Sequence, residues 1–219
     1  MRVLLFDTET TGLPHKPQFP AKMCKNNWAD IVSIAWILAD ENGNALETEY
    51  HVIRPDGWSI PQESVEIHKI TEEYAYECGE SLGSVVVKFI ECVRRSDIVV
   101  AHNINFDKNV INNALRWRMN LPYLLEDVAK RLFCTMRESR EIIGLPGKTK
   151  GTYKMAKLSE MYSRLFEKEP TEVLHNALGD TQIMKDCFFR IWGNPLDLPE
   201  ERIFNTNEET AKPSISATI

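Results

Sequence analysis

Four acidic residues, Asp7, Glu9, Asp107 and Asp180, lie inside or beside stretches of apolar residues that look buried. An unpaired buried carboxylate costs several kcal/mol, which is comparable to the stability margin of a whole domain. No matching run of buried arginine or lysine accompanies them, so divalent metal ions are the cations that fit. The sequence therefore predicts metal-assisted chemistry on a phosphate group.

Asp7 and Glu9 follow the apolar run Val3–Phe6, which is typical of a central strand covered on both faces. Residues two apart in a strand point to the same side, so the two carboxylates share one side at the end of this strand. They repel each other unless a cation lies between them, and their hard oxygen atoms favour Mg²⁺ or Mn²⁺ over zinc. The alternative for this pair alone is a strand end that turns into solvent, where acids are common.

Asp107 lies on the apolar side of a helix predicted over Asn105–Arg118, because the residues three, four and seven further on are Val110, Ile111 and Ala114. The helix follows the apolar strand DIVVA at residues 97–101, and ligands of open α/β sheets bind at the carboxyl ends of strands. A first-turn aspartate stabilised by the helix dipole is the alternative. The phase of Asp107 toward the core argues against that alternative.

Asp180 repeats this pattern on a helix predicted over Asn176–Trp192, where its neighbours on the same side are Ala177, Met184, Cys187 and Ile191. His175 lies five residues before Asp180, a rotation of about 500° that does not place both on one face of a continuous helix. We expect His175 in the loop before the helix, over the mouth of the site, where it can act as a base. Histidines of this kind are more often surface or packing residues.

The order of predicted elements indicates an α/β fold with a mixed five-stranded sheet flanked by helices. The strands are expected over Val3–Phe6, Ile31–Leu38, Leu46–Ile53, Asp97–Ala101 and Phe133–Thr135. The helices are expected over Ser81–Arg95, Asn105–Arg118, Arg137–Ile143, Ala156–Phe166 and Asn176–Trp192. Residues 1–192 form the expected domain, and residues 193–219, rich in proline, acid and serine, are expected to be a flexible tail.

The segment Pro14–Asp30 is predicted to be a loop, with three prolines, three lysines and a Trp28 that looks exposed. It joins the first carboxylate pair to the second strand, so it lies near the site. A connecting insertion is the simplest interpretation, and a lid that grips the substrate is the alternative.

Composition and charge limit the class of protein. Five cysteines with no CxxC pair argue against a zinc knuckle or a disulfide framework and for a reducing compartment. No run approaches the roughly 18 apolar residues of a membrane helix. The apolar run at the N-terminus is too short for a signal peptide, because a carboxylate follows at Asp7. We expect an intracellular protein, cytoplasmic or nuclear and not secreted.

The formal net charge of −6 disfavours nucleic-acid binding by a broad basic surface. The charge is uneven, however. Residues 142–159 contain four lysines and no acid: Lys148, Lys150, Lys154 and Lys157. Such a loop could follow a phosphate backbone, and a solvated loop without that role is the alternative.

Three segments together resemble a known family. FDTETTG at Phe6–Gly12, HNINFD at His102–Asp107 and HNALGD at His175–Asp180 are similar, in the same order, to the exonuclease motifs of the DnaQ-like superfamily. The histidine five residues before the last aspartate resembles the DEDDh branch, and IHKIT at Ile67–Thr71 resembles that family's IHGIT segment with Lys69 in place of glycine. The resemblance implies an RNase H-like fold and 3′→5′ exonuclease activity.

The resemblance also implies a role for each acid. Asp7 would bridge two Mg²⁺ or Mn²⁺ ions, Glu9 and Asp180 would complete the first, and Asp107 would hold the second, partly through water. Two such ions, about 4 Å apart, clamp the attacking and leaving oxygens of an in-line displacement. His175 would take a proton from the attacking water, and a nucleoside 5′-monophosphate would leave.

The family further implies residues that grip the 3′ end. The terminal nucleotide would be held by Thr10, Thr11, Gly12, Leu13, Ile67, His68 and Phe106, with Leu13 as a wedge against the base. Leu13 and Phe106 could instead be ordinary core residues. None of these contacts reads a base edge, so we expect single-stranded or frayed ends of DNA or RNA as substrates, with little sequence preference.

Three functional hypotheses follow from these patterns. The first is a free-standing 3′→5′ exonuclease. The second is a proofreading subunit whose main task is to dock on a polymerase or another replication or repair protein, through residues after Trp192. The third, a catalytically inactive nucleic-acid binder, is disfavoured because all four acids and His175 are present.

Overall fold

A computed structural model describes residues 1–171, 175–193 and 198 of the chain. Its centre is a five-stranded sheet with the strand order β3-β2-β1-β4-β5. The strands are β1 (Val3–Thr10), β2 (Ile31–Ala39), β3 (Ala45–Val52), β4 (Ile98–Ala101) and β5 (Leu132–Cys134). β1, β2 and β3 pair antiparallel, whereas β4 pairs parallel with both β1 and β5, so the predicted mixed sheet is confirmed.

Alternation along β1 builds a separate core on each face of the sheet. Leu4 and Phe6 join a cluster that includes Trp36 and Phe89, with the rings of Phe6 and Phe89 4.9 Å apart. On the opposite face, Val3 and Leu5 pack with residues that include Phe188 and Trp192. Every residue of β2 is buried, which explains why its sequence is apolar at every position except Ser33.

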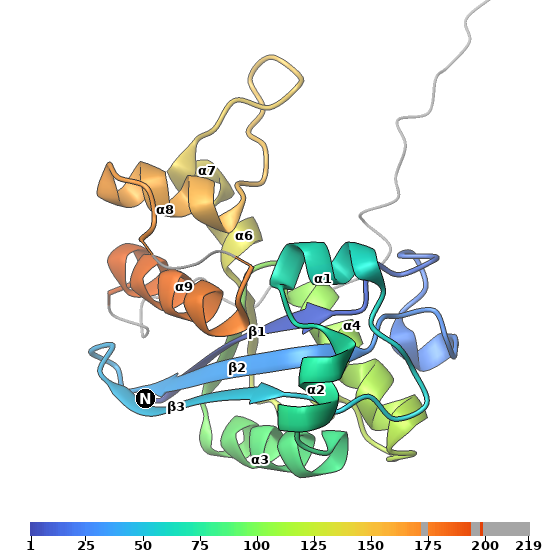
Figure 1. Cartoon of the computed structure of the whole chain (residues 1–219). Helices are drawn as coiled ribbons and strands as arrows, with labels where there is room; N and C mark the ends of the chain where they lie inside the picture. Colours follow the sequence, from blue (N-terminus) through green and yellow to red (C-terminus); the bar gives the residue numbers. More distant parts are fainter. Residues whose placement is uncertain (172–174, 194–197, 199–219) are drawn as a thin grey trace, which may run out of the picture.

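The helices form a layer on each face of the sheet. They are α1 (Gln62–His68), α2 (Glu72–Cys78), α3 (Leu82–Arg95), α4 (Ile104–Asn113), α5 (Leu125–Val128), α6 (Thr135–Glu138), α7 (Arg140–Ile143), α8 (Leu158–Phe166) and α9 (Ala177–Ile191). Figure 1 shows α3 below the sheet and α9, with α8 beside it, above the sheet. The predicted helix over residues 105–118 is interrupted, because α4 gives way to a π-helical turn, η2 (Ala114–Arg118).

Two short helices, α1 and α2, lie between β3 and α3, where the sequence analysis places no helix. Each has seven residues, which is too short for a clear apolar period. Thr71 caps α2 by accepting a hydrogen bond from the backbone N–H of Tyr74, 3.1 Å away. α1 ends at Lys69, whose backbone is left-handed, with φ 64° and ψ 10°.

The conformation of Lys69 gives a first stability prediction. A residue with a Cβ atom is strained in this left-handed region, where glycine is not. We expect Lys69→Gly to raise the free energy of unfolding by about 1 kcal/mol and the melting temperature by about 2–4 °C. Thermal melts followed by circular dichroism measure this gain. Lys69→Ala is the control, because alanine keeps the strain, and an equal gain in both variants would contradict the explanation.

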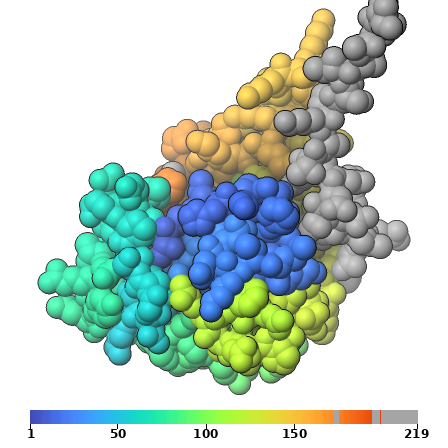
Figure 2. Space-filling view, turned by 90° about the vertical axis from the view of Figure 1, so that its right-hand side faces the viewer, coloured from blue at the N-terminus to red at the C-terminus, as the bar shows by residue number. Residues whose placement is uncertain are grey.

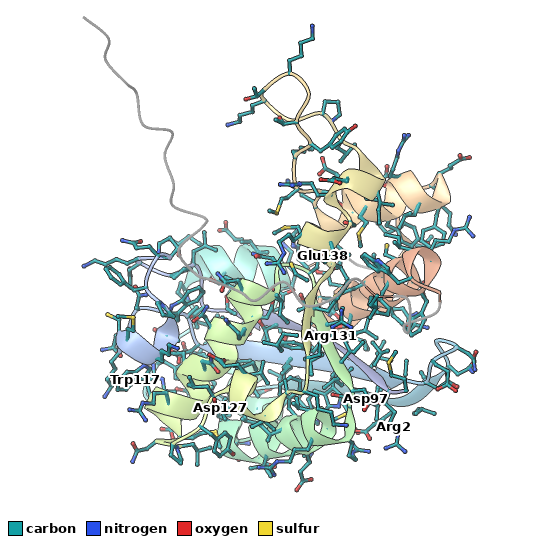
Figure 3. The ribbon with its side chains drawn as sticks, turned by 180° about the vertical axis from the view of Figure 1, so that it is seen from behind. Arg2, Asp97, Trp117, Asp127, Arg131 and Glu138 are labelled. Atoms are coloured by element: carbon teal, nitrogen blue, oxygen red, sulfur yellow. The ribbon has the colours of Figure 1, made fainter. Side chains whose placement is uncertain are left out.

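The segment between β1 and β2 is anchored to α4 and the turn after it. The backbone N–H of Ala21, in the short 3-10 helix η1 (Ala21–Met23), donates to Asn109 Oδ1 at 2.8 Å. The Trp117 indole donates to the Ala21 carbonyl at 2.7 Å, and Figure 3 shows Trp117 beside this segment. The sequence prediction that Trp28 is exposed is wrong: Trp28 is buried, donates to the Phe19 carbonyl and packs its ring against Phe106.

Hydrogen bonds also fix the start of the sheet. Arg2 and Asp97 precede β1 and β4, and the backbone N–H of Arg2 donates to Asp97 Oδ2 at 2.8 Å (Figure 3). Of the residues expected to form a tail, 193–219, only Gly193 and Leu198 are among those described; Leu198 is buried with Val3 and Leu5. In the described part of the chain, no helix is both long and apolar enough to cross a membrane.

Candidate active site

Three of the four predicted acids meet at one place. One carboxylate oxygen from each of Asp7, Glu9 and Asp180 lies within 4.8 Å of the others. Asp7 and Glu9 stand on β1, and Asp180 stands in the first turn of α9. α9 is held over the sheet by the buried Thr181, whose hydroxyl lies 2.7 Å from the Ala177 carbonyl and 3.5 Å from the Ala35 carbonyl.

Strand register explains the shared side of Asp7 and Glu9. Asp7 is paired with Ala35 and Glu9 with Ser33, and the small partners leave room above the sheet. The register shifts between Glu9 and Thr10. Such an irregularity turns a strand and ends its regular pairing, so the carboxylates lie where the chain leaves the sheet.

Asp107 lies on the buried side of α4, as the helical phase predicted, with only 3% of its surface exposed. The hydroxyl of Thr8 donates to Asp107 Oδ1 at 2.8 Å. Asp107 is outside the group of three mutually close acids, yet its charge is close enough to raise the pKa of both Asp7 and Glu9.

The electrostatics of the site are unfavourable without a cation. Burial raises the pKa of Asp7 well above its ordinary value, and the charges of Asp107, Asp180 and Glu9 raise it further. Burial, followed by the charges of Asp180 and Asp107, raises the pKa of Glu9 to about 7. Burial also raises the pKa of Asp107 to about 7, although the hydrogen bond from Thr8 opposes the shift.

Asp180 follows the same rule with one difference. Burial raises its pKa, while the backbone N–H of His175 lowers it by donating to Asp180 Oδ2 at 3.1 Å. His175 lies in the loop directly before α9, as predicted, and its side chain is exposed. The left-handed backbone of His175, with φ 62°, turns its N–H toward Asp180. Asn176 then caps α9 by accepting from the N–H groups of Leu178 and Gly179.

Some of the residues expected to grip a 3′ end are exposed and apolar, and the others are held by local contacts. Leu13 exposes 82% of its surface and Ile67 exposes 54%. Exposure at this level excludes core packing for Leu13, whereas Phe106 packs partly buried against Trp28. Figure 2 shows the N-terminal residues (blue) and the residues around α1 (teal) adjoining on one face, with a small orange surface between them.

The remaining gripping residues are fixed by local hydrogen bonds. Thr10 Oγ1 donates to the Gly12 carbonyl at 2.9 Å, and Gly12 has φ 140°. The backbone N–H of Thr11 donates to the Asp30 carbonyl at 3.0 Å. His68 is buried; its Nδ1 accepts from the Ile70 N–H, and its Nε2 has no hydrogen-bond partner among the described residues. Burial lowers the pKa of His68, so the ring is neutral with its proton on Nε2.

Three residues near the site were not singled out from the sequence. Thr8 orients Asp107, but a threonine in a strand is ordinary. Tyr50 on β3 pairs with Ala35, next to Asp7 in register, and its pKa is raised by burial and by the charge of Glu9. His102 lies within the HNINFD motif, where Nε2 bonds the Ala156 carbonyl at 3.0 Å and Nδ1 bonds Thr135 Oγ1 at 2.9 Å. These roles depend on partners distant in sequence.

The donor set fits divalent metal of the hard type. All the close donor atoms are carboxylate oxygens, and no cysteine belongs to the group. The raised pKa values show that the acids repel one another, and a cation placed among them would remove that repulsion.

This repulsion predicts how stability depends on pH and metal. For Glu9 the pKa rises from 4.5 to about 7 on folding, so the folded state binds the proton more tightly. The contribution of Glu9 to stability without metal is therefore most favourable below about pH 4.5 and falls as the pH rises to about 7. The loss from this group approaches about 3 kcal/mol. We expect Mg²⁺ or Mn²⁺ to raise the melting temperature more at pH 8 than at pH 5. Equal effects at both pH values, measured in thermal melts against EDTA, would contradict this.

Comparison with known proteins places the chain among exonucleases. The model of the RNase_T exonuclease family matches residues 4–188. DNA polymerase III subunit epsilon of Pasteurella multocida (strain Pm70) is 24% identical over 200 residues, covering 91% of this chain and 72% of that protein. The same subunit of Haemophilus influenzae is 25% identical over 201 residues, covering 91% and 71%.

Solved structures agree on the fold. Exonuclease X in complex with 5′ overhanging duplex DNA has a TM-score of 0.57 at 24% identity, covering 87% of this chain and 91% of that one. E. coli exonuclease I in complex with a dT13 oligonucleotide has a TM-score of 0.67 at 18% identity, covering 89% of this chain and 42% of that one. The family match over most of the chain, together with this fold, identifies the protein as a member of the RNase_T exonuclease family, a DnaQ-like 3′→5′ exonuclease with an RNase H-like fold.

Proposed function

We propose that the protein removes nucleotides one at a time from single-stranded or frayed 3′ ends of DNA or RNA and releases nucleoside 5′-monophosphates. The observation that carries the proposal is the group of Asp7, Glu9 and Asp180 within 4.8 Å of one another, with Asp107 buried beside them. Two Mg²⁺ or Mn²⁺ ions would be held by these four carboxylates and would supply charge stabilisation for the attacking and leaving oxygens.

His175 is the proposed general base. Its side chain is exposed and sits directly before the helix that carries Asp180, so the imidazole is free to approach an attacking water. Among the described residues, the hydrogen bond between His175 and Asp180 is made by the backbone N–H, so the exposed imidazole is not used to hold that acid. The left-handed backbone at this position sets the direction of the side chain.

The terminal nucleotide is proposed to lie between Leu13 and Ile67. Both side chains expose apolar surface that gains from contact with a base. His68 is proposed to line this pocket: its Nε2–H is buried and has no hydrogen-bond partner among the described residues, so a small movement of the ring would be needed to offer it to a sugar or phosphate oxygen. Because the pocket would take an unpaired nucleotide, a duplex end must fray first. Exonuclease X in complex with overhanging DNA and exonuclease I in complex with an oligonucleotide are compatible with this substrate class.

Stepwise shortening of labelled strands tests the proposal. Single-stranded DNA and RNA of one sequence, labelled at the 5′ end, should give a descending ladder with Mg²⁺ or Mn²⁺ and none with EDTA. Product analysis should find nucleoside 5′-monophosphates from the first turnover. Internal cleavage, or loss of the 5′ label as a mononucleotide, would contradict the proposed polarity.

A role as a polymerase-docking proofreading subunit is the second candidate. The observation in its favour is the match to two DNA polymerase III epsilon subunits over 91% of this chain. Copurification with a polymerase from the source cells, and its loss when residues after 193 are removed, would support this role. Retention of the polymerase by the truncated chain would exclude docking through those residues.

A further inference from the structure

A basic hairpin projects from the body of the protein between α7 and α8. Pro146 and Tyr153 form its antiparallel bridge. The Gly147 N–H donates to the Thr152 carbonyl at 2.8 Å, and the Thr152 N–H donates to the Thr149 carbonyl at 3.0 Å. Figure 1 shows the hairpin extending beyond the neighbouring helices, and all residues from 148 to 154 are exposed.

The tip of this hairpin carries unneutralised positive charge. Lys148 and Lys150 are exposed, and neither forms an ion pair with any residue that the structure describes. Lys154, at the base, is instead paired with Glu160 at 2.6 Å. Residues 142–159 hold no acid, in a chain whose net charge is −6. A local positive surface on an acidic protein attracts a polyanion and is not needed for solubility.

An exposed aromatic ring accompanies the charge. Tyr153, in the bridge at the base of the hairpin, exposes 49% of its surface, and the nearest point of its ring lies only 3.9 Å from where a Cβ on Gly144 would be. The ring therefore lies close to Gly144 while much of the residue stays open to solvent. Lysines beside an open aromatic ring are the combination that binds single-stranded nucleic acid, by phosphate contact and base stacking.

The base of the hairpin is tied to the catalytic acids. The chain leaving the hairpin reaches Ala156, whose carbonyl accepts from His102 Nε2 at 3.0 Å. Burial lowers the pKa of His102 to about 4, so the ring stays neutral and keeps this bond. His102 directly follows β4, five residues before Asp107. The base of the hairpin is thus hydrogen-bonded to the turn between β4 and α4, and α4 carries Asp107.

The reach of the hairpin decides which phosphates it can touch. Lys150 is six residues from Ala156, which spans at most about 20 Å of extended chain. Phosphates of one stacked strand repeat about every 3.4 Å, so Lys150 can contact phosphates up to about six nucleotides from Ala156. Figure 2 shows the hairpin (gold) rising above the face where the N-terminal residues and α1 adjoin.

We propose that Lys148, Lys150 and Tyr153 bind the single strand several nucleotides upstream of its 3′ end, which makes long strands better substrates than dinucleotides. The inference rests on the proposed function, because it assigns a substrate length to the same site. Lys148 and Lys150 contact backbone phosphates, and Tyr153 stacks on a base. The terminal nucleotide remains the task of Leu13 and Ile67.

Direct binding is the primary test, because it does not require turnover. A fluorescent oligothymidylate of about twenty nucleotides is titrated with full-length protein in EDTA, so that the strand is not degraded, and anisotropy is recorded between about 50 and 200 mM salt. The double variant Lys148→Gln/Lys150→Gln should bind about five- to tenfold more weakly at low salt and should lower the slope of log K against log salt by about 1.4. Tyr153→Ala should weaken binding with the slope unchanged, because stacking carries no charge.

A matched control removes the same charge elsewhere. Lys88→Gln/Lys130→Gln deletes two lysines that pair with Glu80 and Asp97, on α3 and just before β5. This control should keep the wild-type affinity and slope. The second readout is the ratio of kcat/KM for the long strand to that for a thymidine dinucleotide, which should fall only in the hairpin variants.

The outcomes separate this inference from the proposed function. Equal affinity and equal salt slope in the hairpin double variant and the control would overturn the inference, even if the enzyme is an active exonuclease. Loss of binding in the hairpin variants would support it even if the products of hydrolysis contradict the proposed function. The hairpin variants should keep the wild-type melting temperature, since their side chains are exposed, whereas the control loses two surface ion pairs and should melt slightly earlier.

Discussion

Replacing Asp7 by asparagine is expected to lower kcat by about 10³-fold or more and, at the same time, to make the metal-free protein more stable. Asp7 is the acid surrounded by the most like charge, with Asp107, Asp180 and Glu9 all raising its pKa. Asparagine keeps the size of the side chain and removes one of the repelling charges. It also removes a ligand that the proposed cations need.

The sign of the stability change depends on pH. The pKa of Asp7 is higher in the folded state than in the unfolded state. The Asp7 charge therefore destabilises the fold at pH values above the unfolded-state pKa, and it has no effect at low pH, where the group is protonated in both states. The gain from Asp7→Asn in EDTA should therefore be near zero at about pH 4 and reach about 1–3 kcal/mol at pH 8. Urea titrations at the two pH values, with and without EDTA, measure it.

Asp97→Asn is the matched control for this experiment. The pKa of Asp97 is lowered by Lys130 and by the N–H of Arg2, so its charge favours folding. The control should keep full activity and lose a little stability at neutral pH. If Asp7→Asn also loses stability in EDTA at pH 8, then the four acids do not repel one another in the way that the pKa shifts require.

Replacing His175 is expected to lower kcat by about 10²- to 10⁴-fold while leaving metal affinity unchanged. The reason is that His175 contacts Asp180 through its backbone N–H, which every substitution except proline retains. Asparagine is the best replacement, because His175 has a left-handed backbone that asparagine tolerates. Alanine would mix the loss of the imidazole with backbone strain of about 1–2 kcal/mol.

Two measurements separate a base from a structural residue at this position. The Mg²⁺ concentration that half-stabilises the protein in thermal melts reports metal affinity, and it should match the wild type in His175→Asn. Added imidazole should restore part of the lost turnover, since a free base can take the proton if the pocket is open to solvent. A large rise in the Mg²⁺ midpoint, or no response to imidazole, would assign His175 another role.

Much of the site could be predicted because its residues break the local rules of the sequence. Asp107 and Asp180 stand on apolar stripes, and helical phase alone places them toward the core. Asp7 and Glu9 follow a buried strand with the spacing of one face. The three motifs then fix the family, whereas the role of each residue in catalysis stays a prediction.

The features that escaped prediction depend on partners distant in the chain. Trp28 sits among prolines and lysines and looks exposed, yet Phe106, about eighty residues later, covers it. Thr8 gains its role from Asp107, and α1 and α2 are stabilised by contacts of Ile70 and Ala75 with Val32 and Val52 of the sheet. Local composition carries no information about these contacts. Hydrophobic periodicity also does not reveal helices of only seven residues.

The acids come from opposite ends of the chain, and this has a consequence for biosynthesis. Asp7 lies on β1 and is translated before all the helices of this domain, whereas Asp180 is translated with α9, the last helix among the described residues. Chains emerge from the ribosome with the N-terminus first. A nascent or prematurely terminated polypeptide lacking α9 therefore has an incomplete set of acids, so cutting power would arise only once α9 has been translated.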